Sequence, residues 1–205
     1  MIMPRESRDY PAHIIKCRDL PKGGPVIVRP IRVADTELLQ AFVRSLSPRT
    51  RRDRFFSTMC ELPPYLLARF TQVDYRREMV LLAAVQESGK EAVAGVAQYA
   101  PGPREDRCEF ALVVHDAWQR RRVGSFLLDS LMQCADAASY RSMEGDVLRD
   151  NTAMLEMAAS RRFEIRTSPQ NLALRRVQVT LEPGLVVQRA RHGQRFSHSG
   201  KGRLS

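Results

Sequence analysis

Glu109 is a single carboxylate at the start of an apolar stretch that continues through Val114. A glutamate in such surroundings must either reach solvent at a groove or be buried with a charged partner. At a groove it could take up a proton as a general base. The alternative is a structural glutamate that pairs with an arginine of a neighbouring strand, and the sequence leaves both roles open.

A basic turn follows this stretch closely. Residues Gln119 to Ser125 read Gln-Arg-Arg-Arg-Val-Gly-Ser, and helical spacing begins at Val123. The start of a helix offers unpaired backbone N–H groups and the positive end of the helix dipole, so such a turn can hold a phosphate. The alternative is a basic turn that is merely exposed to solvent.

The two stretches need a strand and a helix to position them. The run Phe110 to Val114 is short and apolar, which predicts a buried strand. Apolar residues then recur at helical spacing from Val123 to Ala135, which predicts an amphipathic helix. Alternation along the strand puts Cys108 on the face opposite Glu109, so we do not expect Cys108 to act as a covalent nucleophile beside that carboxylate.

The rest of the chain alternates between apolar periodic segments and turn residues. Asp35 is expected to cap the first helix, Gly95 indicates a bulge or a tight contact within a strand, and the residues 110–114 complete a three-strand meander. Strands are expected at residues 25–32, 79–85, 92–99, 110–114, 142–148, 163–165 and 174–181. Helices are expected at residues 35–46, 48–56, 64–70, 123–135 and 152–159.

These residues carry a family resemblance. The loop Gln119 to Ser125 resembles the acetyl-CoA pyrophosphate loop of GNAT N-acetyltransferases, and the order of the elements is similar to theirs. The resemblance implies an α+β fold whose mixed, mostly antiparallel sheet is splayed between its fourth and fifth strands and flanked by helices. Arg122 stands where that family usually has its first loop glycine, and Arg120 replaces another glycine of many relatives. Whether this weakens coenzyme A binding is left open.

The resemblance also implies roles for individual residues. Glu109 sits at the position of the catalytic glutamate, and acetyl-CoA is the implied co-substrate, with no metal. Asn151 matches an asparagine that contacts coenzyme A, although it could also cap a helix. Position 158, where many relatives have a tyrosine acid, is Ala158. The implied acetyl-CoA-binding residues are Leu112, Val113, Val114, Gln119, Arg120, Arg121, Arg122, Val123, Gly124, Ser125 and Asn151.

The segments 28–32 and 46–56 resemble bacterial GNAT protein-lysine acetyltransferases in particular. This implies direct acetyl transfer to a protein lysine in a ternary complex. Two alternatives are a small-molecule amine N-acetyltransferase and a non-catalytic regulator that binds acyl-CoA. The arginines of the second helix could steer an acidic partner, but a solvated helix face is the interpretation we favour.

Composition sets the wider limits. The chain has 205 residues, a net charge of +10 and four cysteines without metal-ligand spacing, and no apolar run suits a membrane span. We expect a cytoplasmic enzyme that acts as a monomer or a homodimer. The positive charge could attract a polyanion, but no nucleic-acid motif accompanies it, so a nucleic-acid partner is not expected. The expected organisation is an extended arm at residues 1–24, a GNAT domain at 25–183 and a disordered basic tail at 184–205.

Overall fold

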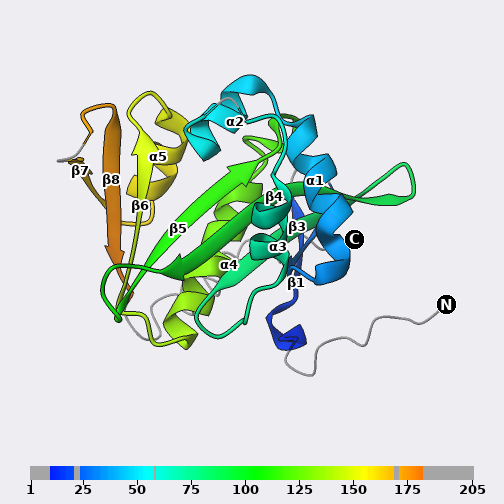
Figure 1. Cartoon of the computed structure of the whole chain (residues 1–205), viewed down its shortest axis with the longest axis horizontal. Helices are drawn as coiled ribbons and strands as arrows, with labels where there is room; N and C mark the ends of the chain where they lie inside the picture. Colours follow the sequence, from blue (N-terminus) through cyan, green and yellow to red (C-terminus); the bar gives the residue numbers. More distant parts are fainter. Residues whose placement is uncertain (1–9, 21–23, 58, 169–170, 182–205) are drawn as a thin grey trace, which may run out of the picture.

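The computed structural model describes residues 10–20, 24–57, 59–168 and 171–181. They form an α+β fold of one eight-stranded sheet with helices on both faces (Figure 1). The elements in chain order are η1 (Ala12–Ile14), β1 (Lys16–Leu20), β2 (Gly24–Pro30), η2 (Val33–Asp35), α1 (Thr36–Ser45), α2 (Pro48–Phe55), α3 (Pro64–Thr71), β3 (Met79–Glu87), β4 (Lys90–Pro101), β5 (Arg107–Val114), η3 (Asp116–Trp118), α4 (Val123–Ala137), β6 (Ser142–Leu148), α5 (Thr152–Ala159), β7 (Glu164–Thr167) and β8 (Leu174–Thr180).

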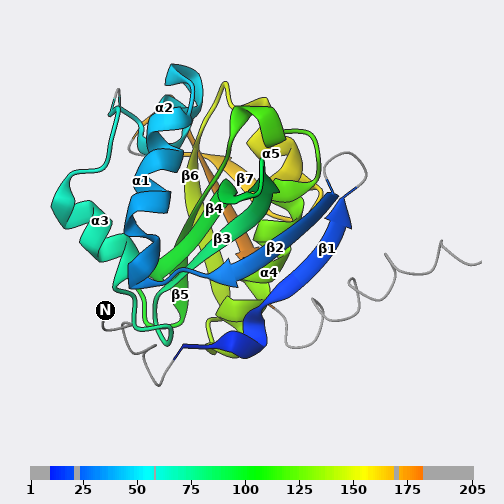
Figure 2. The same cartoon turned by 90° about the vertical axis from the view of Figure 1, so that its right-hand side faces the viewer.

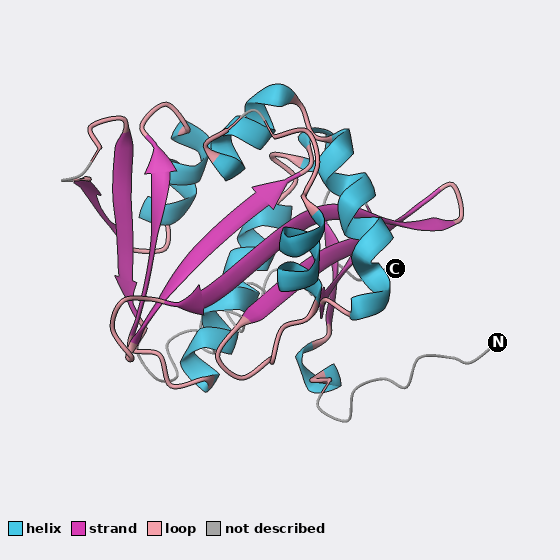
Figure 3. Ribbon diagram, in the orientation of Figure 1, coloured by secondary structure: helices cyan, strands magenta, loops and turns pink. Residues whose placement is uncertain are grey.

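The sheet is mixed and mostly antiparallel, as expected. Its strand order is β1-β2-β3-β4-β5-β6-β8-β7, and the pair β5–β6 is the parallel one. This pair is joined only where Arg107–Glu109 face Ser142–Glu144, whereas β4 accompanies β5 as far as Val114. Beyond Glu109 the strands β5 and β6 therefore part, and Figure 3 shows them diverging toward the end where α2 and α5 lie. The predicted splay is confirmed.

The segment predicted as an extended arm contains a strand that the sequence did not reveal. Lys16–Leu20 form β1, which pairs antiparallel with β2. Only Leu20 of this strand is buried, so the segment lacks the alternation that marks a half-buried strand. A short, polar strand is what the edge of a sheet favours. Residues 1–9 and the predicted basic tail lie outside the described residues.

Helices cover the two faces of the sheet in separate groups. Figure 2 shows α1, α2 and α3 on one side and α4 and α5 on the other. The apolar side of α4 packs into the larger core, where Leu127, Leu128 and Leu131 are fully buried. Strand β3 is buried on both faces along most of its length, which explains its continuous apolar sequence. The central strands thus form a rigid base for the parted pair.

Gly95 lies at a bulge and also makes a close packing contact. The register between β3 and β4 shifts there, because Ala83 faces Gly95 whereas Ala84 faces Val93. A Cβ at Gly95 would come within 2.9 Å of the Leu127 side chain and 3.0 Å of the Val113 carbonyl oxygen. The missing side chain lets α4 approach the sheet closely beside the end of β5.

Candidate active site

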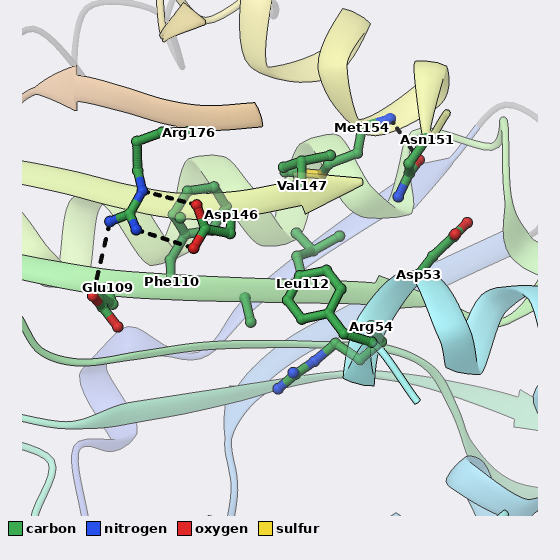
Figure 4. Close-up of a pocket in the computed structure, with 13 residues that line it drawn as sticks. Asp53, Arg54, Glu109, Phe110, Leu112, Asp146, Val147, Asn151, Met154 and Arg176 are labelled. Atoms are coloured by element: carbon green, nitrogen blue, oxygen red, sulfur yellow. Dashed lines mark hydrogen bonds and ion pairs between the residues drawn. The ribbon is translucent and has the colours of Figure 1, made fainter. Parts of the chain in front are cut away.

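A cleft of about 180 Å³ opens where β5 and β6 part. Its walls come from β5, β6, β8, α2 and the start of α5, and Figure 4 shows the side chains that line it. Glu109 and Asn151 are the predicted site residues that project into it, together with the predicted strand residue Leu112. Several other lining residues were not predicted from the sequence. Those that determine the charge and the shape of the cleft are Asp53, Arg54, Phe56, Asp146 and Arg176.

Glu109 reaches solvent in this cleft. Its side chain is 54% exposed, and the nearest cation is the guanidinium of Arg176, with 4.0 Å between Nη1 and the Glu109 carboxylate. Both possibilities raised by the sequence are therefore present in part, since the residue lines a groove and has an arginine nearby. A distance of 4.0 Å is too long for a hydrogen bond. The carboxylate thus keeps lone pairs open to the cleft.

Arg176 is held by other acids. It makes a two-point contact with Asp146, at 2.8 and 3.0 Å, and donates to Glu144 at 3.2 Å. Glu144 is 3% exposed and also accepts from Arg107 at 2.8 Å. The sequence signal for this group was a pair of acids on the predicted strand 142–148 and two arginines on the predicted strand 174–181, but the pairing depends on the order of the strands.

The strand residues predicted to bind the coenzyme lie beyond the point of parting. Leu112, Val113 and Val114 have ladder partners on β4 but none on β6 among the described residues. Val113 is 6% exposed and packs under α1, as an ordinary core residue would. The backbone on the open side of this stretch is what could pair with an extended ligand.

The basic turn has a backbone conformation that usually belongs to glycine. Arg120 and Arg122 have φ values of 58° and 67°, in the left-handed region. Helix α4 then begins at Val123 without a side-chain hydrogen bond at its cap. Its first-turn N–H groups are therefore not used by a cap, and the positive end of the dipole faces the same way. This geometry suits a phosphate.

The side chains of the turn have varied surroundings. Gln119 donates to Thr50 Oγ1 at 3.3 Å and to the Val114 carbonyl at 3.2 Å, which ties the turn to α2 and to β5. The Arg121 guanidinium lies 5.1 Å from the centre of the Trp118 ring, whereas Arg120 and Arg122 are exposed. The two hydrogen bonds of Gln119 hold the turn in place, and Arg120 and Arg122 remain at the surface.

Gly124 sets how closely α4 approaches its neighbours. A Cβ at this position would lie 3.3 Å from the Met157 sulfur and 3.3 Å from a methyl group of Val114. The glycine therefore lets the first turn of α4 pack tightly between α5 and the end of β5. This places the predicted phosphate-binding turn at the open end of the parted strands.

Asp116 connects this end of β5 to α2. Its carboxylate accepts from the Ser47 backbone N–H at 2.9 Å, and from the Ser47 and Thr50 hydroxyls at 2.7 Å each. Partial burial opposes ionisation, but these hydrogen bonds hold the pKa of Asp116 below its ordinary value. Asp116 also lies at the N-terminus of α2, where the helix dipole favours an anion.

The arginine-rich helix α2 is more than a solvated face, contrary to our preferred interpretation. Arg49 is exposed and Arg52 pairs with Asp150 at 3.0 Å, but Arg54 turns into the cleft. The Arg54 guanidinium packs over the rings of Phe55 and Phe70, at 5.0 and 5.9 Å from their centres. Burial lowers the pKa of Arg54 to about 10. A run of similar charges gives no sequence signal for which arginine turns inward.

Asp53 and Phe56 complete the α2 side of the cleft. Burial and then the nearby Asp150 raise the pKa of Asp53, while Arg49 and Arg52 oppose the shift. Phe56 ends α2 in a left-handed conformation with φ 53° and is 49% exposed. A bulky residue rarely adopts this conformation, and such strain is common at ligand sites.

Asn151 caps α5 and lines the cleft. Its Oδ1 accepts from the Met154 N–H at 3.1 Å, so its expected capping role is confirmed. Figure 4 shows the other end of the amide directed toward the cleft. Ala158, the position without the tyrosine, is fully buried. Cys108 is also fully buried on the α4 side, and burial raises its pKa to about 12, which makes it a poor nucleophile.

Comparisons with known proteins agree with this geometry. Residues 43–163 match the acetyltransferase (GNAT) family. An acetyltransferase of Pseudomonas aeruginosa is 30% identical over 152 residues, which cover 74% of this chain and 82% of the relative. The GNAT domain of S. lividans PAT superposes with a TM-score of 0.75 at 28% identity, over 84% of this chain and 99% of that domain.

A more distant structure shows the same fold. The Salmonella typhimurium protein yncA, solved with its cofactor acetyl-CoA, has a TM-score of 0.60 at 18% identity over 77% of this chain and 94% of its own. The chain therefore belongs to the GNAT family of N-acetyltransferases, which use acetyl-CoA. None of the described helices is long and apolar enough to cross a membrane.

Proposed function

We propose that this protein transfers the acetyl group of acetyl-CoA to a lysine of another protein, directly and within a ternary complex. The observation that carries the proposal is the exposed carboxylate of Glu109 in the cleft between the parted strands. Four free cysteines fit a reducing compartment and support a cytoplasmic location.

Two features support acetyl-CoA as the acyl donor. The first turn of α4, from Val123 to Ser125, would receive the pyrophosphate on its N–H groups. The backbone of 112–114, unpaired on the β6 side, would pair with the pantetheine arm, and Asn151 would contact the same arm from α5. The two sites adjoin each other because Gly124 packs against Val114.

Glu109 would solve the proton problem of the reaction. A lysine amine has an unperturbed pKa of about 10.4, so neutralising it near pH 7 costs about 4–5 kcal/mol. The Glu109 carboxylate would accept that proton, directly or through a water, as the nitrogen attacks the thioester carbonyl. The C–N bond forms, the C–S bond breaks, and coenzyme A leaves as the thiolate, which takes up a proton. Its pKa, like that of cysteine at about 8.5, requires no strong acid.

The carbonyl oxygen gains negative charge during the attack. Backbone N–H groups of the parted stretch 112–114 are suited to stabilise it, because they are fixed in place by the β4 ladder. Ala158 offers no proton, so the leaving thiolate would depend on solvent.

Calorimetric titration with acetyl-CoA, followed by a thiol-release assay, tests this function. We expect acetyl-CoA to bind and lysine-containing proteins to accept label from labelled acetyl-CoA. Turnover of polyamines or amino acids alone would point to a small-molecule enzyme instead. Binding without turnover of any amine would point to a regulator that senses acyl-CoA.

A further inference from the structure

Arg54 is a cation in the cleft without an acidic partner. It makes no hydrogen bond or ion pair with another residue of the described ranges, and its contacts are the two phenylalanine rings. Its neighbours on α2 differ, because Arg49 is exposed to water and Arg52 reaches Asp150. Arg54 is only partly exposed, and keeping a charge partly withdrawn from water with no anion beside it is costly, which suggests that a ligand supplies the anion.

None of the other charged residues of the cleft pairs with Arg54 within the described part of the chain. Arg176 is occupied by Asp146 and Glu144, and its contact with Glu109 is the long one of 4.0 Å. Glu109 and Arg54 are therefore an anion and a cation in one cleft, and among the described residues neither has a close partner of opposite charge. Figure 4 shows the Arg54 side chain extending along β5 on the side toward which Glu109 points.

The position of Arg54 also separates it from the predicted coenzyme site. Phe70 belongs to α3, so Arg54 packs within the α1–α3 layer. Helix α4, at whose start the pyrophosphate is expected, lies on the opposite face of the sheet (Figure 2), and the turn before it is joined to α2 at Thr50, one helical turn before Arg54. Arg54 is thus placed to meet the acceptor that enters from the α2 side, not the phosphates of the donor.

We propose that Arg54 binds a carboxylate that the acceptor carries beside its reactive amine, so that lysines flanked by aspartate or glutamate are preferred. This inference rests on the proposed function and specifies its substrate class. The planar guanidinium can bind a carboxylate through two parallel hydrogen bonds, and its packing on aromatic rings fixes its orientation. Glu109 takes the amine of the same acceptor, and Phe56 lines the same cleft.

A pair of peptides tests this preference. Both have blocked ends and one lysine, which is flanked by glutamate in the first peptide and by glutamine in the second. With the wild-type protein we expect kcat/KM to be about tenfold higher for the glutamate peptide, since one charge-assisted contact is worth about that much. Arg54→Gln should abolish the preference, and Arg54→Lys should restore part of it because it keeps the charge.

Arg49→Gln is the matched control, because it removes the same charge from the exposed side of the same helix. It should keep the preference. Acetyl-CoA affinity, measured by calorimetry, should be equal in all four proteins, which also shows that the variants are folded. A loss of acetyl-CoA affinity in Arg54→Gln would place Arg54 on the donor and overturn the proposal.

Calorimetry with the two peptides separates this proposal from the proposed function. Carboxylate-dependent binding that Arg54→Gln abolishes supports the Arg54 contact even if neither peptide is acetylated, in which case the lysine acetyltransferase function is wrong. Equal acetylation and equal binding of the two peptides overturn the Arg54 contact and leave the function standing. Free lysine, which carries a carboxylate, is also compared with cadaverine, which lacks it. If the preference appears only between these two small amines and not between the peptides, Arg54 binds the carboxylate of a free amino acid.

Discussion

The two ends of strand β5 belong to one continuous strand but have opposite environments. At the paired end, Arg107–Glu109 are joined to β6, and Glu144 is buried between two arginines. At the parted end, residues 110–114 have lost β6, and the cleft takes its place. Glu109 stands at the boundary, directly across from Glu144 in the parallel register.

The contrast between these two glutamates shows how position decides the role of a side chain. Glu144 is 3% exposed and bonded to Arg107 and Arg176, so its charge is fully used in holding strands together. Glu109 is 54% exposed and has only a distant cation. A group whose lone pairs are all occupied is a poor base, whereas one open to a cleft can accept a proton. The paired end therefore supports the fold, and we expect the boundary residue to serve the reaction.

Glu144→Gln should have the largest effect and should act on stability. Removing this charge leaves two arginines, both partly buried, without their shared partner, which should lower the free energy of unfolding by about 3 kcal/mol. Urea denaturation measures the change. Glu164→Gln, which removes an exposed ion pair with Arg166, is the matched control and should alter stability by less than about 0.5 kcal/mol. Equal changes in the two variants would contradict the assigned roles.

Glu109→Gln should act on turnover instead. Without a base to accept the amine proton, kcat should fall by at least about tenfold near pH 7, equivalent to about 1.4 kcal/mol. Acetyl-CoA affinity and the urea midpoint should stay at wild-type values, because the side chain is exposed and only weakly paired. Wild-type turnover in this variant would remove Glu109 from the mechanism.

Arg122→Gly tests the parted end at the turn. A left-handed φ of 67° costs a non-glycine residue about 1 kcal/mol, whereas glycine adds about 0.5 kcal/mol of entropy cost on folding. We expect the free energy of unfolding, measured by urea denaturation, to be about 0.5 kcal/mol higher in the variant. Arg149→Gly, at an exposed position without positive φ, should instead be destabilising. The same sign in both variants would mean that the turn is not strained.

Asp116→Asn should have the smallest effect, and its pH dependence is the informative part. The pKa of Asp116 is depressed in the folded state, so its contribution is complete above the unfolded value of about 3.9 and disappears as pH falls through the lower folded value. Near pH 6 the free energy of unfolding should be about 0.3 kcal/mol higher for the wild type than for the variant, which is the lower end of the range for a charge at a helix terminus. Urea denaturation at a series of pH values should show the difference shrinking below about pH 4.

Much of the fold was predictable because its periodic segments are strongly apolar. The meander, the helix from Val123 and the strand at residues 142–148 all form as expected. Asp35 stands at the N-cap of α1 as expected, but two features did not follow from the sequence. The strand β1 is polar and has no periodic signal, and Asp35 directs its carboxylate to Arg29 and to the Arg32 N–H instead of capping α1 with a hydrogen bond. The pairing with Arg29 depends on a buried contact between β2 and η2, which no local pattern records.

The candidate site divides in the same way. The sequence indicated Glu109, the basic turn and Asn151, because each interrupts or ends a periodic element. It did not distinguish Arg54 from the other arginines of α2 and did not indicate Asp53. It also did not indicate Arg176 and Asp146, which meet only because β8 lies beside β6.

The amino-acid sequence by itself determined the strand, turn and helix at residues 107–137, since hydrophobic periodicity and helix-start signals act over a few residues. Only the tertiary structure decided which charged side chains are paired with an opposite charge and which remain open to the cleft. The register of β5 against β6 gives Glu144 two arginines and leaves Glu109 exposed, and the packing of α2 on α3 turns Arg54 inward. Such pairings join residues far apart in the chain, so they follow from the assembled sheet and not from local pattern.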